Sequence, residues 1–107
     1  MARELKNLGI VNPNANVETL AFAQGTAGLF LVSVIATNTS IEDARFDVTV
    51  FNASASTNNA FIAKSQLLPG RNSYETQRFT LDYNDAIYIK STSSSVSFLV
   101  SGINQTE

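Results

Sequence analysis

Three oxygen-bearing residues near the C-terminal third of the chain could bind a metal ion. Asp82, Asn84 and Asp85 stand together in one short segment. Their oxygens are suitable ligands for Ca²⁺, but this ion takes about six to eight of them. No further acidic residue follows at a spacing that would complete a calcium loop. We therefore favour an Asx-type turn, in which such side chains bond to the nearby backbone, and expect no metal and no cofactor.

A second acidic group could supply the paired carboxylates of general acid–base catalysis. Glu42 and Asp43 are adjacent, and Asp47 follows shortly after them. The first two lie in a polar connector, whereas Asp47 alternates with apolar residues on the side of a strand that should face water. We expect all three to be solvated surface charges.

Serine hydroxyls are the remaining candidate nucleophiles. A nucleophilic serine needs a base within hydrogen-bond reach, and the chain contains no histidine. The adjacent pairs Lys64–Ser65 and Lys90–Ser91 offer lysine as the base, but neighbours on a strand point to opposite faces. Cysteine is absent as well. We expect the chain not to be an enzyme.

Tyrosines are the residues that could bind a sugar. Tyr74 and Tyr83 lie near predicted turns, and tyrosines on the loops of a β-sandwich can stack on sugar rings. The alternative is that tyrosines only pack: Tyr88 alternates with Ile87 and Ile89, as at a sheet boundary. We favour packing and keep glycan binding by Tyr74 and Tyr83 as the second hypothesis.

The elements that must position these residues are β-strands. Leu29–Asn38, Arg45–Asn52 and Ser95–Ile103 are rich in β-branched and aromatic residues, show no helical periodicity and are flanked by short polar residues. Four shorter strands are predicted at Val17–Ala23, Ala60–Leu68, Ser73–Leu81 and Ala86–Lys90. About seven to eight strands with turns between them predict an all-β chain, a single antiparallel β-sandwich of the jelly-roll or immunoglobulin-like kind.

Turn residues separate the predicted strands. Pro69 followed by Gly70 is typical of a type II turn, in which proline presets the first φ and glycine accepts the positive second one. Within Arg45–Asn52, Phe46, Val48 and Val50 should face the core, so that Asp47 and Thr49 face water.

Composition excludes several classes of partner. The chain has 107 residues, which fits one domain, and carries seven basic against nine acidic residues, for a net charge of −2. The basic residues are scattered along the chain, so we expect no nucleic acid partner. The most apolar window, Ala27–Ala36, is about half of the roughly 20 residues that a membrane-spanning helix needs. No secretory signal follows the charged start of the chain, and we expect no membrane association and no export.

Several strands are apolar on both faces. Leu31 and Ile35 have the opposite parity to Val32 and Val34, and Phe51 and Leu99 are likewise opposite to their apolar neighbours. A sandwich has a single core, so we expect Leu31, Phe51 and Leu99 to contact other subunits, and the chain to form a homo-oligomer.

The N-terminal segment is expected to be an extended arm. A tract of asparagines around Pro13 separates residues 1–16 from a sandwich domain at 17–107. An arm of this kind can add a strand to an exposed sheet edge on a neighbour. The partner-binding residues would be Leu5, Leu8, Ile10 and Val11.

The segment Ala2–Leu20 (ARELKNLGIVNPNANVETL) resembles the start of a group of small virion proteins from tailed bacteriophages, particularly marine ones. Later landmarks extend the resemblance over most of the chain: Phe61–Ala63, Leu67–Asn72, Leu81–Asp85, Ser91–Thr92, Val96–Phe98 and Gly102–Ile103. The chain departs from the family pattern at Ala23–Gly25, where the family carries a Val-Pro step.

The resemblance implies a non-enzymatic structural component of a phage virion, assembled in the host cytoplasm. Its partners would be the major capsid protein, as for a capsid decoration or cement protein, or the tail proteins. The second hypothesis is a glycan-binding adhesion module of a tail fibre or baseplate.

Overall fold

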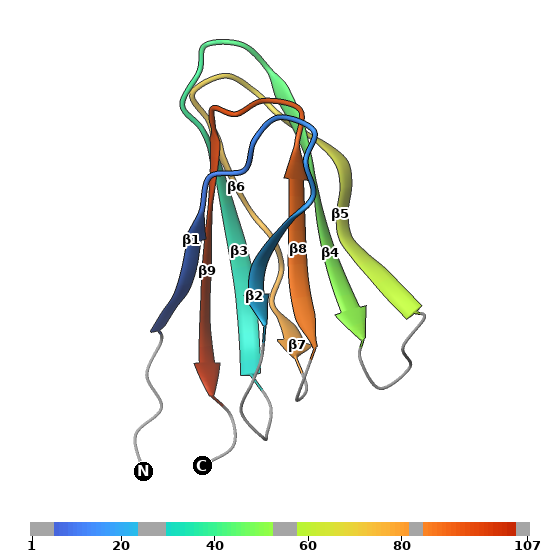
Figure 1. Ribbon diagram of the computed structural model, residues 1–107. Helices are drawn as coiled ribbons and strands as arrows, with labels where there is room; N and C mark the ends of the chain where they lie inside the picture. The colour runs from blue at the N-terminus through green and yellow to red at the C-terminus, as the bar shows by residue number, and fades with distance from the viewer. Residues whose placement is uncertain (1–5, 24–29, 53–57, 82–84, 105–107) are drawn as a thin grey trace.

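The computed structural model describes residues 6–23, 30–52, 58–81 and 85–104. These residues form nine strands and no helix, which confirms the prediction of an all-β chain (Figure 1). The strands are β1 (Lys6–Val11), β2 (Thr19–Ala23), β3 (Phe30–Asn38), β4 (Ala44–Asn52), β5 (Asn58–Leu68), β6 (Ser73–Glu75), β7 (Phe79–Leu81), β8 (Ala86–Ser91) and β9 (Val96–Asn104).

The strands pair into two antiparallel sheets. Sheet A has the order β1-β9-β3-β6, and β7 also pairs with β3; sheet B has the order β2-β8-β4-β5. The pairing is nested along the chain, since β1 pairs with β9, β2 with β8, β3 with β6 and β7, and β4 with β5. The two halves of the chain thus run antiparallel like one long hairpin that is rolled up into two layers.

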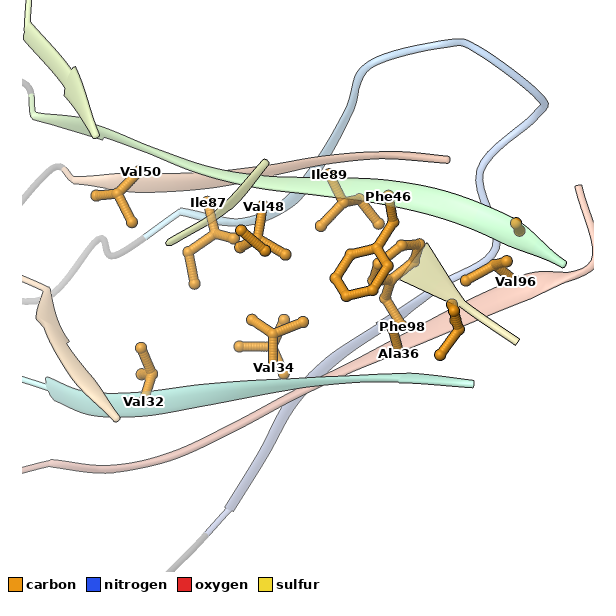
Figure 2. Close-up of a cluster of buried hydrophobic side chains, with 14 of the residues drawn as sticks. Val32, Val34, Ala36, Phe46, Val48, Val50, Ile87, Ile89, Val96 and Phe98 are labelled. Atoms are coloured by element: carbon orange, nitrogen blue, oxygen red, sulfur yellow. The ribbon is translucent and has the colours of Figure 1, made fainter. Parts of the chain in front are cut away.

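The hydrophobic core fills the space between the sheets. Figure 2 shows Val48 and Ile89 of sheet B facing Val34 of sheet A. The ring of Phe46 on β4 meets that of Phe98 on β9 edge-on, with centroids 5.8 Å apart. Such edge-to-face pairs add to the stabilisation that burial itself gives. Because every second residue of each long strand enters this core, the intervening residues form two outer faces.

The alternation predicted for β4 is confirmed for Phe46, Val48 and Val50, which are buried. The prediction that Thr49 faces water is wrong, since only 6% of this residue is exposed. Thr49 does lie on the outer side, but its neighbours across the sheet are Phe61 on β5 and Tyr88 on β8. These large side chains flank the small threonine and cover it.

The single strand predicted at Ser73–Leu81 is interrupted, because Thr76 takes over part of the sheet's hydrogen bonding. Its hydroxyl oxygen accepts from the backbone N–H of Val34 at 3.0 Å, and its own N–H donates to the carbonyl of Val34 at 2.9 Å. A side-chain oxygen thus replaces the backbone carbonyl of a regular ladder. The chain therefore leaves β6 at Glu75 and rejoins the sheet as β7 at Phe79.

The turn after β5 lies one residue later than predicted. The N–H of Asn72 donates to the carbonyl of Pro69, and the positive φ of 60° falls on Arg71 rather than on Gly70. Gly70 is required for a different reason: a Cβ at this position would collide with the backbone carbonyl group of Ile41.

Residues 6–11 are not confirmed as an extended arm. They form β1 at the edge of sheet A, paired with β9 of the same chain. Leu8 and Val11 pack against the chain's own core, whereas Ile10 points outward and is 65% exposed. A Cβ on Gly9 would lie 2.9 Å from the carbonyl oxygen of Ala21, so β1 and β2 approach closely at this side of the molecule.

Asn38 ties the two sheets together at one end. It is 1% exposed, and its amide nitrogen donates to the carbonyls of Glu42 at 2.7 Å and Leu68 at 3.1 Å. Its amide oxygen accepts from the N–H of Ser40 at 3.0 Å. Since Asn38 ends β3 in sheet A and Leu68 ends β5 in sheet B, this side chain fixes the connection between the layers.

Candidate functional site: two outer faces and a side hollow

The outer side of sheet A, here named the neutral face, consists of rows that run across the strands. Two rows are aliphatic and two carry hydroxyl groups. The aliphatic rows are Ile10–Leu99–Ile35 and Ile103–Leu31, and the hydroxyl rows are Ser101–Ser33 and Ser97–Thr37–Ser73. The two kinds of row alternate along the strands. Consecutive outward positions of a strand are about 7 Å apart, so the face has a regular relief of large and small side chains.

Charge is nearly absent from the neutral face. Among the side chains described in its rows and at their ends, Glu75 on β6 is the one charged group. The hydroxyl of Ser33 donates to its carboxylate at 3.4 Å, and the hydroxyls of Thr37 and Ser73 lie 3.2 Å apart. The predicted contact residues Leu31 and Leu99 both lie here and are half-buried within the isolated chain.

The outer side of sheet B, here named the charged face, has a different character. Its outward residues include the four ionic side chains Arg45, Asp47, Lys64 and Lys90 and the three aromatic ones Phe51, Phe61 and Tyr88. Glu18, Thr49, Phe51 and Tyr88 line an open hollow of about 310 Å³ on this side. The predicted contact residue Phe51 therefore lies on the opposite side of the molecule from Leu31 and Leu99.

A bulge in β5 organises the ionic groups of the charged face. Lys64 and Ser65 both lie opposite Asp47, and Ser65 adopts a positive φ of 48°. The carboxylate of Asp47 accepts from the N–H of Ser65 at 2.7 Å, and Arg45 donates to the carbonyl of Ser65 at 2.8 Å. The Lys64 ammonium lies 3.8 Å from Asp47 and 4.6 Å from the ring centre of Phe61. Asp47, whose side chain is only 19% exposed, therefore stabilises the bulge and is not the freely solvated charge that was predicted.

The two lysine–serine pairs differ in geometry. Strand alternation does not separate Lys64 from Ser65, because these residues lie in the bulge. The ammonium of Lys64 is instead directed to Asp47 and Phe61. Lys90 and Ser91 lie on opposite sides of β8 as predicted: Lys90 is exposed, and the buried Ser91 donates to the carbonyl of Ser93 at 2.9 Å.

The other acidic candidates have structural roles, are buried or lie outside the described residues. Asp82 and Asn84 lie outside them, and Asp85 is buried. Asp43 accepts from the N–H of Gly70 at 3.1 Å and so anchors the turn after β5. Within the described part of the chain, no three acidic, histidine or cysteine residues come together where they could hold a metal ion.

A third feature is a hollow of about 380 Å³ at the break between β6 and β7. It is lined by Ile62, Tyr74, Thr76, Gln77, Arg78 and Phe79. Tyr74, one of the two predicted sugar-stacking residues, also packs its ring edge-on against Phe46 at 5.7 Å. The other, Tyr83, lies outside the described residues.

Sequence reasoning did not find this hollow. Gln77 and Arg78 lie beside Tyr74 because the strand is interrupted at Thr76. The sequence predicts one continuous strand through Thr76, so it gives no sign of this arrangement. The arm residues behave differently from expectation as well: Leu8 and Val11 are used within the chain, Ile10 is exposed at the edge of the neutral face, and Leu5 lies outside the described residues.

Comparison with known proteins adds no assignment: no family model, no curated protein and no solved structure matches the chain. Among the described residues no helix is long and apolar enough to cross a membrane.

Proposed function

We propose that the two sheets form a β-sandwich of the jelly-roll kind. The strand orders β1-β9-β3-β6 and β2-β8-β4-β5, with β7 beside β6 on β3, support this assignment. In a jelly roll, a long antiparallel hairpin of eight strands wraps into two four-stranded sheets, and β6 with β7 would together count as one interrupted strand. The nested pairing of first strand with last strand is what such wrapping requires.

We propose that the chain is a non-enzymatic structural subunit of a tailed-phage virion, assembled in the host cytoplasm. The observation that carries the structural role is the neutral face, where half-buried aliphatic side chains lie on the outside of the two-sheet unit that the described residues form. The virion assignment rests on the sequence resemblance described above. Jelly rolls are common among viral capsid proteins, which is support by analogy of fold alone.

Binding to other virion proteins would use the neutral face and its margin at β1 rather than a free arm. Leu8 and Val11 hold β1 on the chain's own core, so β1 is a fixed part of sheet A. Ile10, on this strand, continues the aliphatic row of the neutral face and is exposed. A neighbouring capsid or tail protein would contact this side chain and the rows beside it.

Mass spectrometry of purified particles of the phage that encodes the chain tests this proposal. The chain should be present in fixed stoichiometry. A number on the order of hundreds per particle would indicate the head shell, and a small multiple of the tail's rotational symmetry would indicate the tail. Recovery of the chain only from the soluble fraction of infected cells would contradict the proposal.

The second candidate function is glycan binding, which the hollow at Tyr74 favours. An aromatic ring, an amide and a guanidinium line it together, and these groups can contact sugar rings and hydroxyls. Because Tyr74 also packs on Phe46, the discriminating variants are Gln77→Ala and Arg78→Ala, which change exposed side chains. Binding on a glycan array that both variants abolish would support this function, and absence of binding by the unmodified chain would exclude it for the sugars tested.

A further inference from the structure

We infer that the neutral face is the docking surface for a second copy of this chain, with the two copies packed sheet on sheet about a two-fold axis. The inference deepens the proposed structural role and rests on it in one respect, namely that the chain works within an assembly. The partner is another copy of the chain, and it binds to the outside of sheet A.

The relief of the face is self-complementary. Along the strands the rows follow the order hydroxyl, aliphatic, hydroxyl, aliphatic, from Ser97 through Leu99 and Ser101 to Ile103. A two-fold axis that lies in the interface, across the strands and between the rows of Leu99 and Ser101, reverses this order in the partner. Each aliphatic row then faces a hydroxyl row. Large side chains of one copy would fill the space above small side chains of the other, as in packed sheets generally.

The distribution of charge on the two faces also favours the neutral face as the dimer interface. Charged residues are depleted at the centres of protein interfaces, because each buried charge must lose its water. On the neutral face Glu75 lies at the β6 margin, and the rows of the two longest strands of sheet A carry hydroxyl and aliphatic groups only. A dimer through the charged face would instead have to take Arg45, Asp47, Lys64 and Lys90 out of water.

The available area is sufficient for a weak dimer. In sheet A, β3 and β9 each have 9 residues, β1 has 6, and β6 and β7 have 3 each. With a rise of about 3.4 Å per residue and a strand spacing of about 4.8 Å, these strands cover about 490 Å². Two such faces would together cover about 1,000 Å², which is the lower limit for specific interfaces.

Sedimentation velocity of the full chain over a range of concentrations tests the inference. We expect reversible association into a dimer below about 1 mM. Ser101→Arg places a long charged side chain in the central hydroxyl row and should raise the dissociation constant about 30-fold or more. Ser94→Arg makes the same chemical change on the exposed turn before β9, outside the rows of the face, and should leave the constant unchanged. Circular dichroism shows whether both variants fold.

A second variant keeps the test informative if Ser101→Arg does not fold. Leu99→Ala removes the middle of one aliphatic row without adding charge and should weaken the dimer about tenfold. A chain that stays monomeric up to about 1 mM overturns the inference. The inference is also overturned if the dissociation constant of the dimer is unchanged in both Ser101→Arg and Leu99→Ala. Neither result bears on stoichiometric presence in virions, so failure of the inference and failure of the proposed function are distinguishable.

Discussion

The two outer faces of this molecule cover the same core but present opposite chemistry. On the charged face, Asp47 and Lys64 pair at the β5 bulge, and Lys90 is exposed to water. On the neutral face, hydroxyl and aliphatic rows alternate, and Glu75 is the one charge described there. Packing of the core constrains mainly the inward residues of each strand, and the β5 bulge also constrains Arg45 and Asp47. The core does not require the outward hydroxyl and aliphatic rows of the neutral face, so we relate these rows to what the face contacts outside the chain.

The two sheets can also be compared in how they avoid uncontrolled pairing with other chains. Charged side chains and bulges on outer and edge strands discourage uncontrolled pairing, and β5 has both in Lys64 and the bulge at Ser65. The edge strands of sheet A have such devices too, in the irregular register between Asn7 and Gly9 on β1 and in Glu75 on β6. The outward side chains of the central strands β3 and β9 carry no charge. An uncharged, partly aliphatic surface of this kind is expected where another surface covers it.

The largest effect is expected at Phe46, which belongs to the interior shared by both faces. Phe46→Ala removes a ring that contacts Phe98 and Tyr74, and should lower the free energy of unfolding by about 3–5 kcal/mol. Urea denaturation followed by circular dichroism measures the change. A loss below about 1 kcal/mol would show that the two sheets do not share one packed interior.

Asn38 connects the two sheets through hydrogen bonds, so replacing it tests how much this connection stabilises the fold. Asn38→Ala deletes three hydrogen bonds and leaves the buried carbonyl of Leu68 without this donor. We expect a loss of about 2–3 kcal/mol in the free energy of unfolding. Thr39→Ala, which removes an exposed hydroxyl bonded to the carbonyl of Ser95, is the control and should cost less than half as much. Equal losses in the two variants would contradict the linking role.

Thr76 acts on sheet A alone. Thr76→Val keeps the shape but removes the oxygen that accepts from the N–H of Val34, and we expect a loss of about 1–2 kcal/mol. Thr80→Val makes the same change at an exposed position on β7 and should have almost no effect. Amide hydrogen exchange at Val34 should rise in the first variant only. An unchanged exchange rate would show that the hydroxyl does not replace a ladder bond.

The smallest effect is expected on the charged face. Lys64→Met keeps an unbranched aliphatic side chain but removes the ammonium, which pairs with Asp47 and lies over the ring of Phe61. The Lys64 side chain is 63% exposed, and ion pairs of exposed lysines contribute about 0–1 kcal/mol and are screened by salt. The difference in unfolding free energy between this variant and the unmodified chain should therefore shrink at high ionic strength. A large difference that salt does not reduce would show that the pair is shielded from solvent.

Much of the fold follows from the sequence because strand alternation is local. The long strands β3, β4 and β9 were predicted to within about two residues, since their β-branched runs have clear polar ends. The break at Thr76 was missed because a threonine inside such a run looks like any strand residue until its hydroxyl finds Val34. The arm was wrongly separated from the sheet, because only tertiary pairing with β9 distinguishes an edge strand from a free segment.

The surface was harder to predict than the strands. Opposite parity of Leu31 and Leu99 to the core residues did indicate a second apolar side, and both lie on the neutral face. Parity could not place Phe51 on the other sheet, because strand order is set by long-range pairing. The hollow at Tyr74 depends on the same kind of contact, so no local pattern could reveal it.

Cross-linking between two copies tests most directly whether the neutral face is where the chain associates. The chain has no cysteine, so Ser101→Cys introduces a single thiol on this face, and Ser94→Cys introduces one on an exposed turn. With a short bifunctional thiol reagent, we predict rapid formation of covalent dimers by the Ser101→Cys chain and little by the Ser94→Cys chain. Equal and slow cross-linking of both would contradict the account.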